Sequence, residues 1–133
     1  MKQLIIEASV RSIGLVTQFI NSELEAQDCS PRAQVKIDVA IDEIFGNIAR
    51  YAYGDGKGSV TVRFDVKDGF AEICFIDDGV PFNPLEVDEP DISLAAEERD
   101  IGGLGIFLVK KTMDKVEYER KDNQNILRLS KRI

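Results

Sequence analysis

The feature that most constrains the fold is an amphipathic pattern that runs from Pro31 to Tyr53. Ser30 and Pro31 are residue types preferred at a helix N-cap and at the first helical position, and the glycine-rich residues 54–58 end the pattern. The sequence therefore predicts one long helix with a single buried face. The apolar stripe covers an arc of roughly 100° on a helical wheel and consists of Ile37, Ala40, Ile41, Ile44, Ile48 and Tyr51.

Two polar side chains, Glu43 and Asn47, lie on the border of this stripe. They are one helical turn apart and roughly 40° apart around the helix axis. A solvated carboxylate belongs opposite the stripe, and a core excludes a carboxylate unless it is paired. The border position therefore favours a cleft floored by the core. The alternative is an ordinary amphipathic helix with two polar boundary residues, which this pair alone does not exclude.

Strands and shorter helices account for the rest of the predicted fold. Strands joined by short turns pair antiparallel. The alternation of apolar and polar residues along these strands predicts that helices cover one face of the sheet. We predict an α+β fold, a two-layer sandwich with helices on one face of a mixed, mainly antiparallel sheet, in a single domain over residues 1–133. The other expected elements are a strand at 3–8, a helix at 9–27, strands at 59–66 and 70–76, a helix at 106–113 and strands at 116–120 and 125–129.

Composition excludes several classes of chemistry. The 133 residues contain no histidine, which rules out Ser–His and Cys–His catalysis, histidine zinc sites and a phosphohistidine intermediate. Cys29 and Cys74 form no metal-binding spacing. The net charge of −7 argues against direct nucleic-acid binding, and no apolar run approaches the roughly 20 residues that span a membrane. We expect a cytoplasmic protein that binds neither nucleic acid nor membrane.

A second motif, Asp77-Asp78-Gly79, directly follows the predicted strand at 70–76. A carboxylate at a strand end can accept a hydrogen bond from an exocyclic amine, and the nearby glycine lets the backbone approach a flat ligand. The alternative is a plain turn, since turns use Asp and Gly.

A third motif, Gly102-Gly103-Leu104-Gly105, precedes the helix predicted from Ile106. Free N–H groups at a helix start favour a phosphate. The alternative is a flexible hinge before an apolar helix. The motif lacks the Gly-Lys-Ser/Thr ending of a Walker A loop. The acidic, weakly patterned residues between the second and third motifs, about 85–101, have the length of a functional loop and form a lid candidate.

Taken together, the three motifs resemble those of the GHKL ATPase superfamily, which has the histidine-kinase-like, Bergerat-type fold. The order is Glu-x-x-x-Asn on a helix, Asp-x-Gly after a strand, a lid-length loop, and Gly-x-Gly at a helix start. The segments DDGVPFNP and GGLGIFLVKKTMDKVEY are more closely similar to the anti-sigma-factor serine/threonine kinases, the small bacterial single-domain members. The resemblance covers essentially the whole chain.

The resemblance implies a role for each motif residue. Glu43 would be the general base on the substrate hydroxyl, and Asn47 would bind the Mg²⁺ that bridges the phosphates of ATP. Asp77 would accept a hydrogen bond from the adenine amino group, beside Gly79. The phosphates would meet the backbone amides of Gly103, Leu104 and Gly105. Two residues depart from the wider pattern: Tyr51 stands where relatives often have a histidine, and Pro81 replaces a glycine.

The resemblance also implies a function. The first hypothesis is an ATP- and Mg²⁺-dependent serine/threonine kinase that sequesters a sigma factor and phosphorylates an anti-sigma-factor antagonist. Relatives of this type often pair, so the resemblance allows a homodimer. The second hypothesis is a non-catalytic module, in which ATP controls the affinity for a signalling partner. The catalytic half of a histidine kinase is a third reading, which the missing acceptor histidine and the missing dimerisation hairpin disfavour. A plain globular domain with chance motifs is a fourth.

Overall fold

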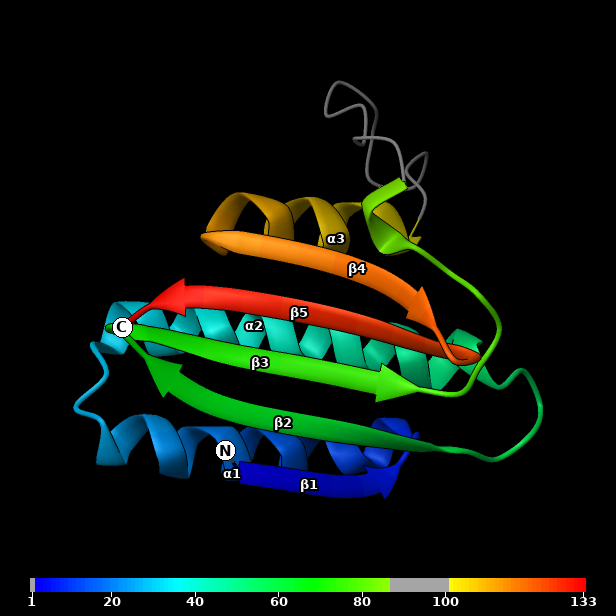
Figure 1. The fold of residues 1–133 in the computed structure, drawn as a ribbon, viewed down its shortest axis with the longest axis horizontal. Coiled ribbons are helices and arrows are strands. Elements are labelled where there is room, and N and C mark those ends of the chain that lie inside the picture. Colours follow the sequence, from blue (N-terminus) through cyan, green and yellow to red (C-terminus); the bar gives the residue numbers. More distant parts are fainter. Residues whose placement is uncertain (1, 87–100) are drawn as a thin grey trace.

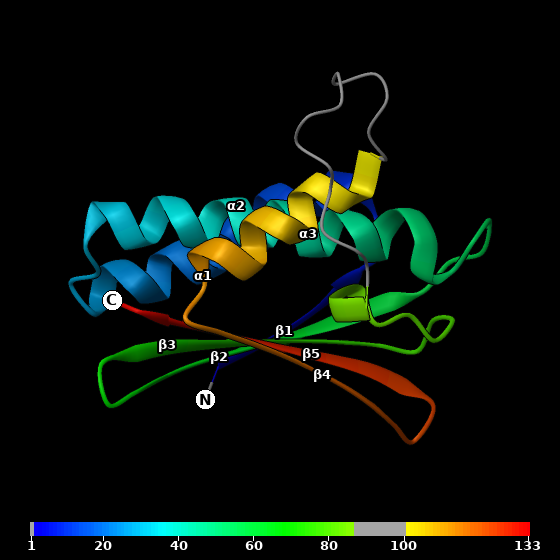
Figure 2. The same ribbon diagram turned by 90° about the horizontal axis from the view of Figure 1, so that it is seen from above.

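The computed structural model describes residues 2–86 and 101–133, apart from the side chains of residues 101–104. The described residues form one five-stranded sheet with the strand order β1-β2-β3-β5-β4. Three α-helices cover one face of the sheet, as the view from above makes clear (Figure 1, Figure 2). The strands are β1 (Lys2–Glu7), β2 (Ser59–Lys67), β3 (Phe70–Asp77), β4 (Lys115–Lys121) and β5 (Gln124–Arg132), and the helices are α1 (Ile13–Ala26), α2 (Pro31–Asn47) and α3 (Ile101–Thr112).

This architecture confirms the predicted α+β two-layer sandwich. Every pairing in the described sheet is antiparallel, although the sequence had left room for a mixed sheet. Two tight turns set the register of the hairpins. Asp68 and Gly69 join β2 to β3, and Asp122 and Asn123 join β4 to β5, all four with positive φ angles. Positive φ at both central residues is typical of the two-residue turns that match strand twist.

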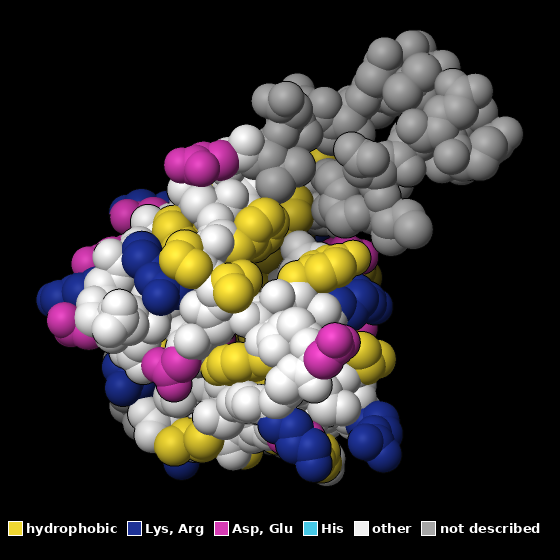
Figure 3. Space-filling view, turned by 90° about the vertical axis from the view of Figure 1, so that its right-hand side faces the viewer, with side chains coloured by type: hydrophobic (Ala, Val, Ile, Leu, Met, Phe, Trp, Pro, Cys, Tyr) yellow, Lys and Arg dark blue, Asp and Glu magenta, His cyan; other side chains and the backbone are white. Residues whose placement is uncertain are grey.

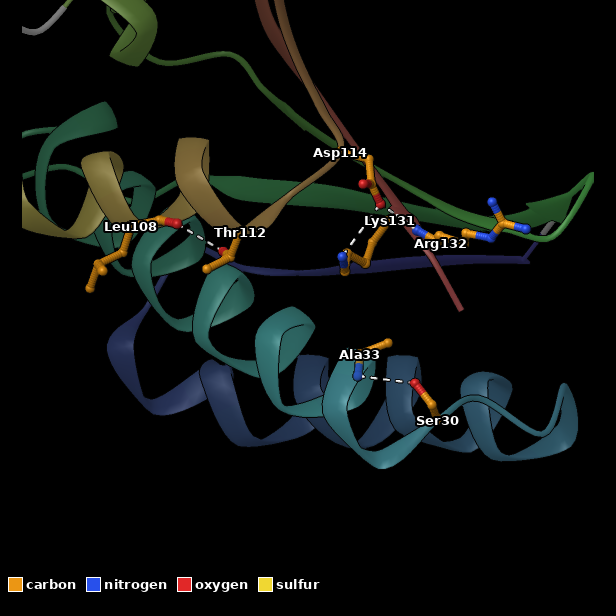
Figure 4. Close-up of polar contacts among 7 residues, drawn as sticks. All are labelled: Ser30, Ala33, Leu108, Thr112, Asp114, Lys131 and Arg132. Carbon is orange, nitrogen blue, oxygen red and sulfur yellow. Dashed lines mark hydrogen bonds and ion pairs between the residues drawn. The ribbon is translucent and has the colours of Figure 1, made fainter.

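Helix α2 lies centrally in the helical layer and begins as predicted. Ser30 Oγ accepts a hydrogen bond from the backbone N–H of Ala33 at 3.2 Å (Figure 4), with Pro31 in the first turn. The predicted helix to Tyr53 is divided in two, because α2 ends at Asn47 and a π-helical turn, η2 (Ile48–Ala52), continues it. Such turns are uncommon and frequently occur at functional sites. Gly54 then adopts φ 56° and ends the helix.

The core lies between the sheet and the helices. Alternate residues of the central strands face the helical layer, and α2 contributes Ile37, Ile41 and Phe45, all fully buried. Val62, Phe75 and Leu127 lie opposite one another across three strands. This packing joins segments that are far apart in the chain. None of the described helices is long and apolar enough to cross a membrane.

Helix α3 differs from the prediction at its start. The sequence predicted a glycine turn over residues 102–105 and a helix from Ile106, whereas α3 already begins at Ile101. Each glycine in a helix interior costs about 1 kcal/mol relative to alanine. Burial of Ile106, Val109 and Met113 in the core offsets this cost, because tertiary packing regularly outweighs helix propensity.

The turn from α3 into β4 is held by Asp114. Its carboxylate accepts a hydrogen bond from the backbone N–H of Arg132 at 2.7 Å and lies 3.5 Å from Nζ of Lys131 (Figure 4). The hydrogen bond from Arg132 lowers the pKa of Asp114, and the charges of Lys131 and Lys36 lower this pKa further. The end of α3 is thereby tied to the C-terminal strand.

We predict that Asp114 stabilises the fold above about pH 4 and ceases to do so at lower pH. Its pKa is lowered in the folded state, so its contribution is lost as the pH falls through that value. Asp114→Asn should lower the melting temperature by about 1–4 °C at pH 7, and this difference should shrink as the pH falls below the ordinary pKa of an aspartate and toward the lowered pKa of Asp114. Glu117→Gln, which removes the exposed pair with Lys115, is the control. A difference that does not depend on pH would contradict the assignment.

Candidate functional site

The site is built where polar residues replace apolar ones at one end of the core. Along β3, Ala71, Ile73 and Phe75 face the helices, and Asp77 continues this alternation at the strand end. Asp77 pairs with Asn125 of β5 in the sheet register. Both side chains are buried, with exposed fractions of 5% and 6%. A buried carboxylate requires hydrogen-bond donors, and the surrounding residues supply them.

Asn125 is the centre of this polar network. Its Nδ2 donates to Oδ1 of Asp77 at 3.0 Å and to the carbonyl oxygen of Val80 at 2.8 Å. Its Oδ1 accepts from the hydroxyl of Tyr118 at 2.5 Å and from the N–H of Phe82 at 3.3 Å. Both donors and both acceptor positions of the amide are thus in use. The network joins β3, β4 and β5 to the loop that follows β3.

The orientation of the Asp77 carboxylate follows from these contacts. Its Oδ1 accepts from Asn125 and also from the N–H of Gly79 at 2.9 Å. Oδ2 accepts no hydrogen bond from any residue that the structure describes. Within the described part of the structure, the carboxylate is therefore held through Oδ1 alone.

Residues beyond the Asp77–Asn125 network also hold the loop that follows β3. The N–H of Asp78 donates to the hydroxyl of Tyr53 at 2.8 Å, and this hydroxyl donates to the carbonyl of Ser59 at 2.7 Å. Burial raises the pKa of Tyr53, the charges of Asp77 and Asp78 raise it further, and the hydrogen bond from Asp78 acts in the opposite direction. Arg120 donates to the carbonyl of Gly79 at 2.9 Å.

Gly79 has a steric role at this position. A Cβ atom there would overlap the carbonyl oxygen of Ala52 and lie 2.6 Å from the Ala52 side chain. The N–H of Val80 donates to the same carbonyl at 2.8 Å. Only a glycine lets the loop lie this close to the end of η2.

A cavity of about 160 Å³ lies between the end of α2, η2 and this loop. Asn47 and Asp77, two of the predicted site residues, both line it. Its wall is otherwise largely apolar, and apolar cavities of about 150 Å³ admit a benzene-sized ring. The remaining lining residues are Ile44, Ile48, Tyr51, Ala52, Val80, Pro81, Phe82, Pro84, Tyr118, Asn125 and Leu127.

Hydrophobic side chains gather on the end of the molecule that contains the cavity, which faces the viewer in Figure 3. Among the residues that line the cavity, Tyr51 and Val80 are each 58% exposed and Phe82 is 46% exposed. Exposed aromatic and apolar side chains beside a cavity are typical of a site for a flat, partly apolar ligand.

Glu43 lies outside this cavity, between α2 and α3. The half-buried side chain rests against Gly105, where a Cβ atom would overlap its Oε2 and lie 2.5 Å from its Cδ. Gly103 and Leu104 lie in the first turn of α3, where the structure describes the backbone but not the side chain of Leu104. The predicted lid falls mainly on residues 87–100, which also lie outside it.

Asn125 and Tyr118 were not among the site residues predicted from the sequence. The alternation of β5 contained the signal for Asn125, because Leu129 and Leu127 face the core and Asn125 is the next residue on that side. An amide in a core position requires partners, and the predicted antiparallel sheet allowed Asp77 to be one of them. The hydroxyl of Tyr118 reaches this amide only through the pairing of β4 with β5.

Comparison with known proteins identifies the family. Residues 6–131 match the model of the histidine kinase-like ATPase domain. The chain belongs to this family. Membership implies an ATP site. Asn47 and Asp77, which belong to two of the three motifs, line the cavity at the polar end of the core. The predicted resemblance to this class of ATPases is confirmed.

Relatives within the family are serine-protein kinases. RsbW of Bacillus mycoides (strain KBAB4) is 30% identical over 93 residues, and RsbW of Bacillus cereus (strain B4264) is 31% identical over 93 residues. Both matches cover 67% of this chain and 58% of the relative, so the chain spans little more than half the length of these proteins.

Solved structures show the same fold. The RsbU and RsbW domains of Rv1364c from Mycobacterium tuberculosis match with a TM-score of 0.69 at 15% identity, over 99% of this chain and 32% of that one. The catalytic domain of histidine kinase ThkA matches with a TM-score of 0.56 at 11% identity, over 99% and 97% of the two chains.

We predict that Asn125→Ala destabilises the protein more than Tyr118→Phe. The alanine leaves the buried Asp77 and the loop groups without their shared partner, which should cost about 2–4 kcal/mol. Removal of the Tyr118 hydroxyl leaves the other three hydrogen bonds and should cost about 1 kcal/mol. Urea denaturation measures both changes. Equal losses in the two variants would show that Asn125 is not the centre of the network.

Proposed function

We propose that this protein is an ATP-dependent serine/threonine protein kinase that phosphorylates an anti-sigma-factor antagonist and sequesters a sigma factor. The observation that carries the proposal is that Asn47 and Asp77, which are 30 residues apart, line one cavity, with Glu43 one turn before Asn47. Family membership and the similarity to serine-protein kinases RsbW support the chemistry.

Asp77 is proposed to recognise the base. Oδ1 is held by Asn125 and Gly79, so Oδ2 is oriented toward a donor such as the exocyclic amine of adenine. A hydrogen bond to an ionised acceptor contributes roughly 1.5–3 kcal/mol. The apolar wall of the cavity would enclose the ring, and Gly79 would allow the loop to lie close to it.

Asn47 is proposed to bind Mg²⁺. The described residues contain no cluster of three or more acidic, cysteine or histidine side chains able to hold a metal. The amide oxygen of Asn47, which lines the cavity, is a hard ligand that fits Mg²⁺, because this ion usually keeps several waters and takes few protein ligands in addition to substrate phosphates. Bound there with an amide oxygen as ligand, the ion would neutralise charge on the phosphates.

Glu43 is proposed to be the general base. A serine or threonine hydroxyl of the protein substrate would lose its proton to the carboxylate as its oxygen attacks the γ-phosphorus of ATP. The bond from the γ-phosphorus to the bridging oxygen then breaks, and ADP leaves. Glu43 lies roughly 6 Å along the helix axis from Asn47, so the base and the metal ligand belong to one rigid element. Gly103 and Leu104, in the first turn of α3, are proposed to offer backbone amides to the phosphates.

The partners follow from the relatives rather than from the cavity. A sigma factor and its antagonist are proposed because the chain is similar to RsbW proteins, of which it spans 58%. We also propose that one domain covers the whole chain and that residues 85–101 act as the lid.

Titration calorimetry with Mg-ATP tests the base site. Asp77→Asn should weaken binding about 10- to 100-fold, because Asn Oδ1 keeps both internal hydrogen bonds while the amide nitrogen replaces the acceptor oxygen. Asp78→Asn is the matched control, since this exposed neighbour binds Gln124 instead, and its affinity should stay within about threefold. Equal weakening of the two variants would reject Asp77 as the base-recognising residue.

Phosphoryl transfer tests the chemistry. Incubation with Mg-ATP and a cognate antagonist should yield phosphoserine or phosphothreonine, and Glu43→Ala should reduce the rate at least 100-fold while ATP still binds. If Glu43→Ala still binds ATP but no longer regulates its signalling partner, the regulation depends on catalysis. Unchanged signalling in that variant, with no label transferred by the wild type, would instead favour the non-catalytic ATP-dependent module.

A further inference from the structure

The contact between Glu43 and Gly105 joins the proposed base to α3. A Cβ atom at residue 105 would overlap Oε2 of Glu43, lie 2.5 Å from Cδ and lie 3.2 Å from Cγ. Real Cβ atoms do not approach other atoms so closely, so the carboxylate occupies space that exists only because residue 105 has no side chain. The absence of a side chain at residue 105 thus affects where the Glu43 carboxylate can lie.

If residue 105 had a side chain, movement of Glu43 would relieve the resulting overlap more easily than movement of α3. Ile106, Val109 and Met113 anchor α3 in the core, with exposed fractions of 3%, 1% and 6%. Glu43 is half-buried and has three side-chain torsions, so its carboxylate can turn away at small cost. Any side chain at residue 105 would therefore displace the carboxylate.

We propose that Gly105 is a positioning residue that holds the Glu43 carboxylate in its reactive orientation. This inference rests on the proposed kinase function, and it gives Gly105 a different role from phosphate binding. Gly105 is the fifth residue of α3, and the free N–H groups of a helix belong to its first turn. Its backbone amide is therefore a poorer phosphate donor than those that precede it, whereas its missing side chain accommodates Glu43.

The test compares Gly105→Ala with Gly14→Ala. Gly14 also lies in a helix, α1, where a Cβ atom would meet nothing within 4 Å. Gly105→Ala should lower the single-turnover rate of phosphoryl transfer about 100-fold, the cost expected of a displacement of about 1 Å. Its affinity for Mg-ATP should change less than about threefold, and Gly14→Ala should match the wild type in both measurements.

Shortening the carboxylate should compensate for the added methyl group. Glu43→Asp alone should slow transfer, yet Glu43→Asp combined with Gly105→Ala should be about tenfold faster than Gly105→Ala alone. A role in general helix stability would not produce this rescue. An unchanged transfer rate in Gly105→Ala would overturn the proposal, as would a large loss of ATP affinity, which would return Gly105 to the phosphate site.

Melting temperatures test the contact independently of catalysis. The change in melting temperature caused by Gly105→Ala should be more favourable in the Glu43→Ala background than in the wild-type background, because removal of the Glu43 side chain leaves room for the added methyl group. If the wild type transfers no phosphate but the melting temperatures of the Gly105→Ala and Glu43→Ala variants are still non-additive, the kinase function is refuted and the contact stands. Strictly additive melting temperatures would refute the contact itself.

Discussion

The structure depends on burial of the apolar stripe of α2 against the sheet. Ile37, Ile41 and Phe45 are fully buried, and each fully buried side chain of this size contributes roughly 1.5–3 kcal/mol. This helix carries both Glu43 and Asn47 on the border of the stripe. The interaction that drives folding therefore also orients the residues proposed for phosphoryl transfer, one toward α3 and the other toward the cavity.

The polar end of the core is tolerated because its groups satisfy one another. A buried carboxylate without partners would cost several kcal/mol, but Asp77 receives hydrogen bonds from Asn125 and Gly79. Asn125 in turn uses all its donors and acceptors within the protein. A network satisfied in this way is rigid, so the second carboxylate oxygen of Asp77, which accepts no hydrogen bond from the described residues, is held in a fixed orientation. Pre-organisation of this kind lowers the cost of binding.

Most of the fold could be predicted from local patterns. The alternation in 59–66 and 70–76 and the turn at Asp68-Gly69 correspond to β2, β3 and their hairpin, and Ser30-Pro31 marks the start of α2. The start of α3 could not be predicted, because its glycines have weak helix propensity and only packing against the core offsets that cost. The π-helical end of α2 was missed because the continuous apolar pattern gives no signal for a change of helical period.

The sequence by itself determined which residues are candidates for the site, that the chain resembles a class of ATPases, and that it contains no histidine for catalysis. Glu43, Asn47 and Asp77 stand out through residue type and spacing, which are local properties. Only the tertiary structure decided that Asn47 and Asp77 share a cavity, that Asn125 orients Asp77, and that Gly105 lies against Glu43. These relations join residues between 30 and 62 positions apart, and such contacts depend on strand order and helix packing rather than on any local pattern.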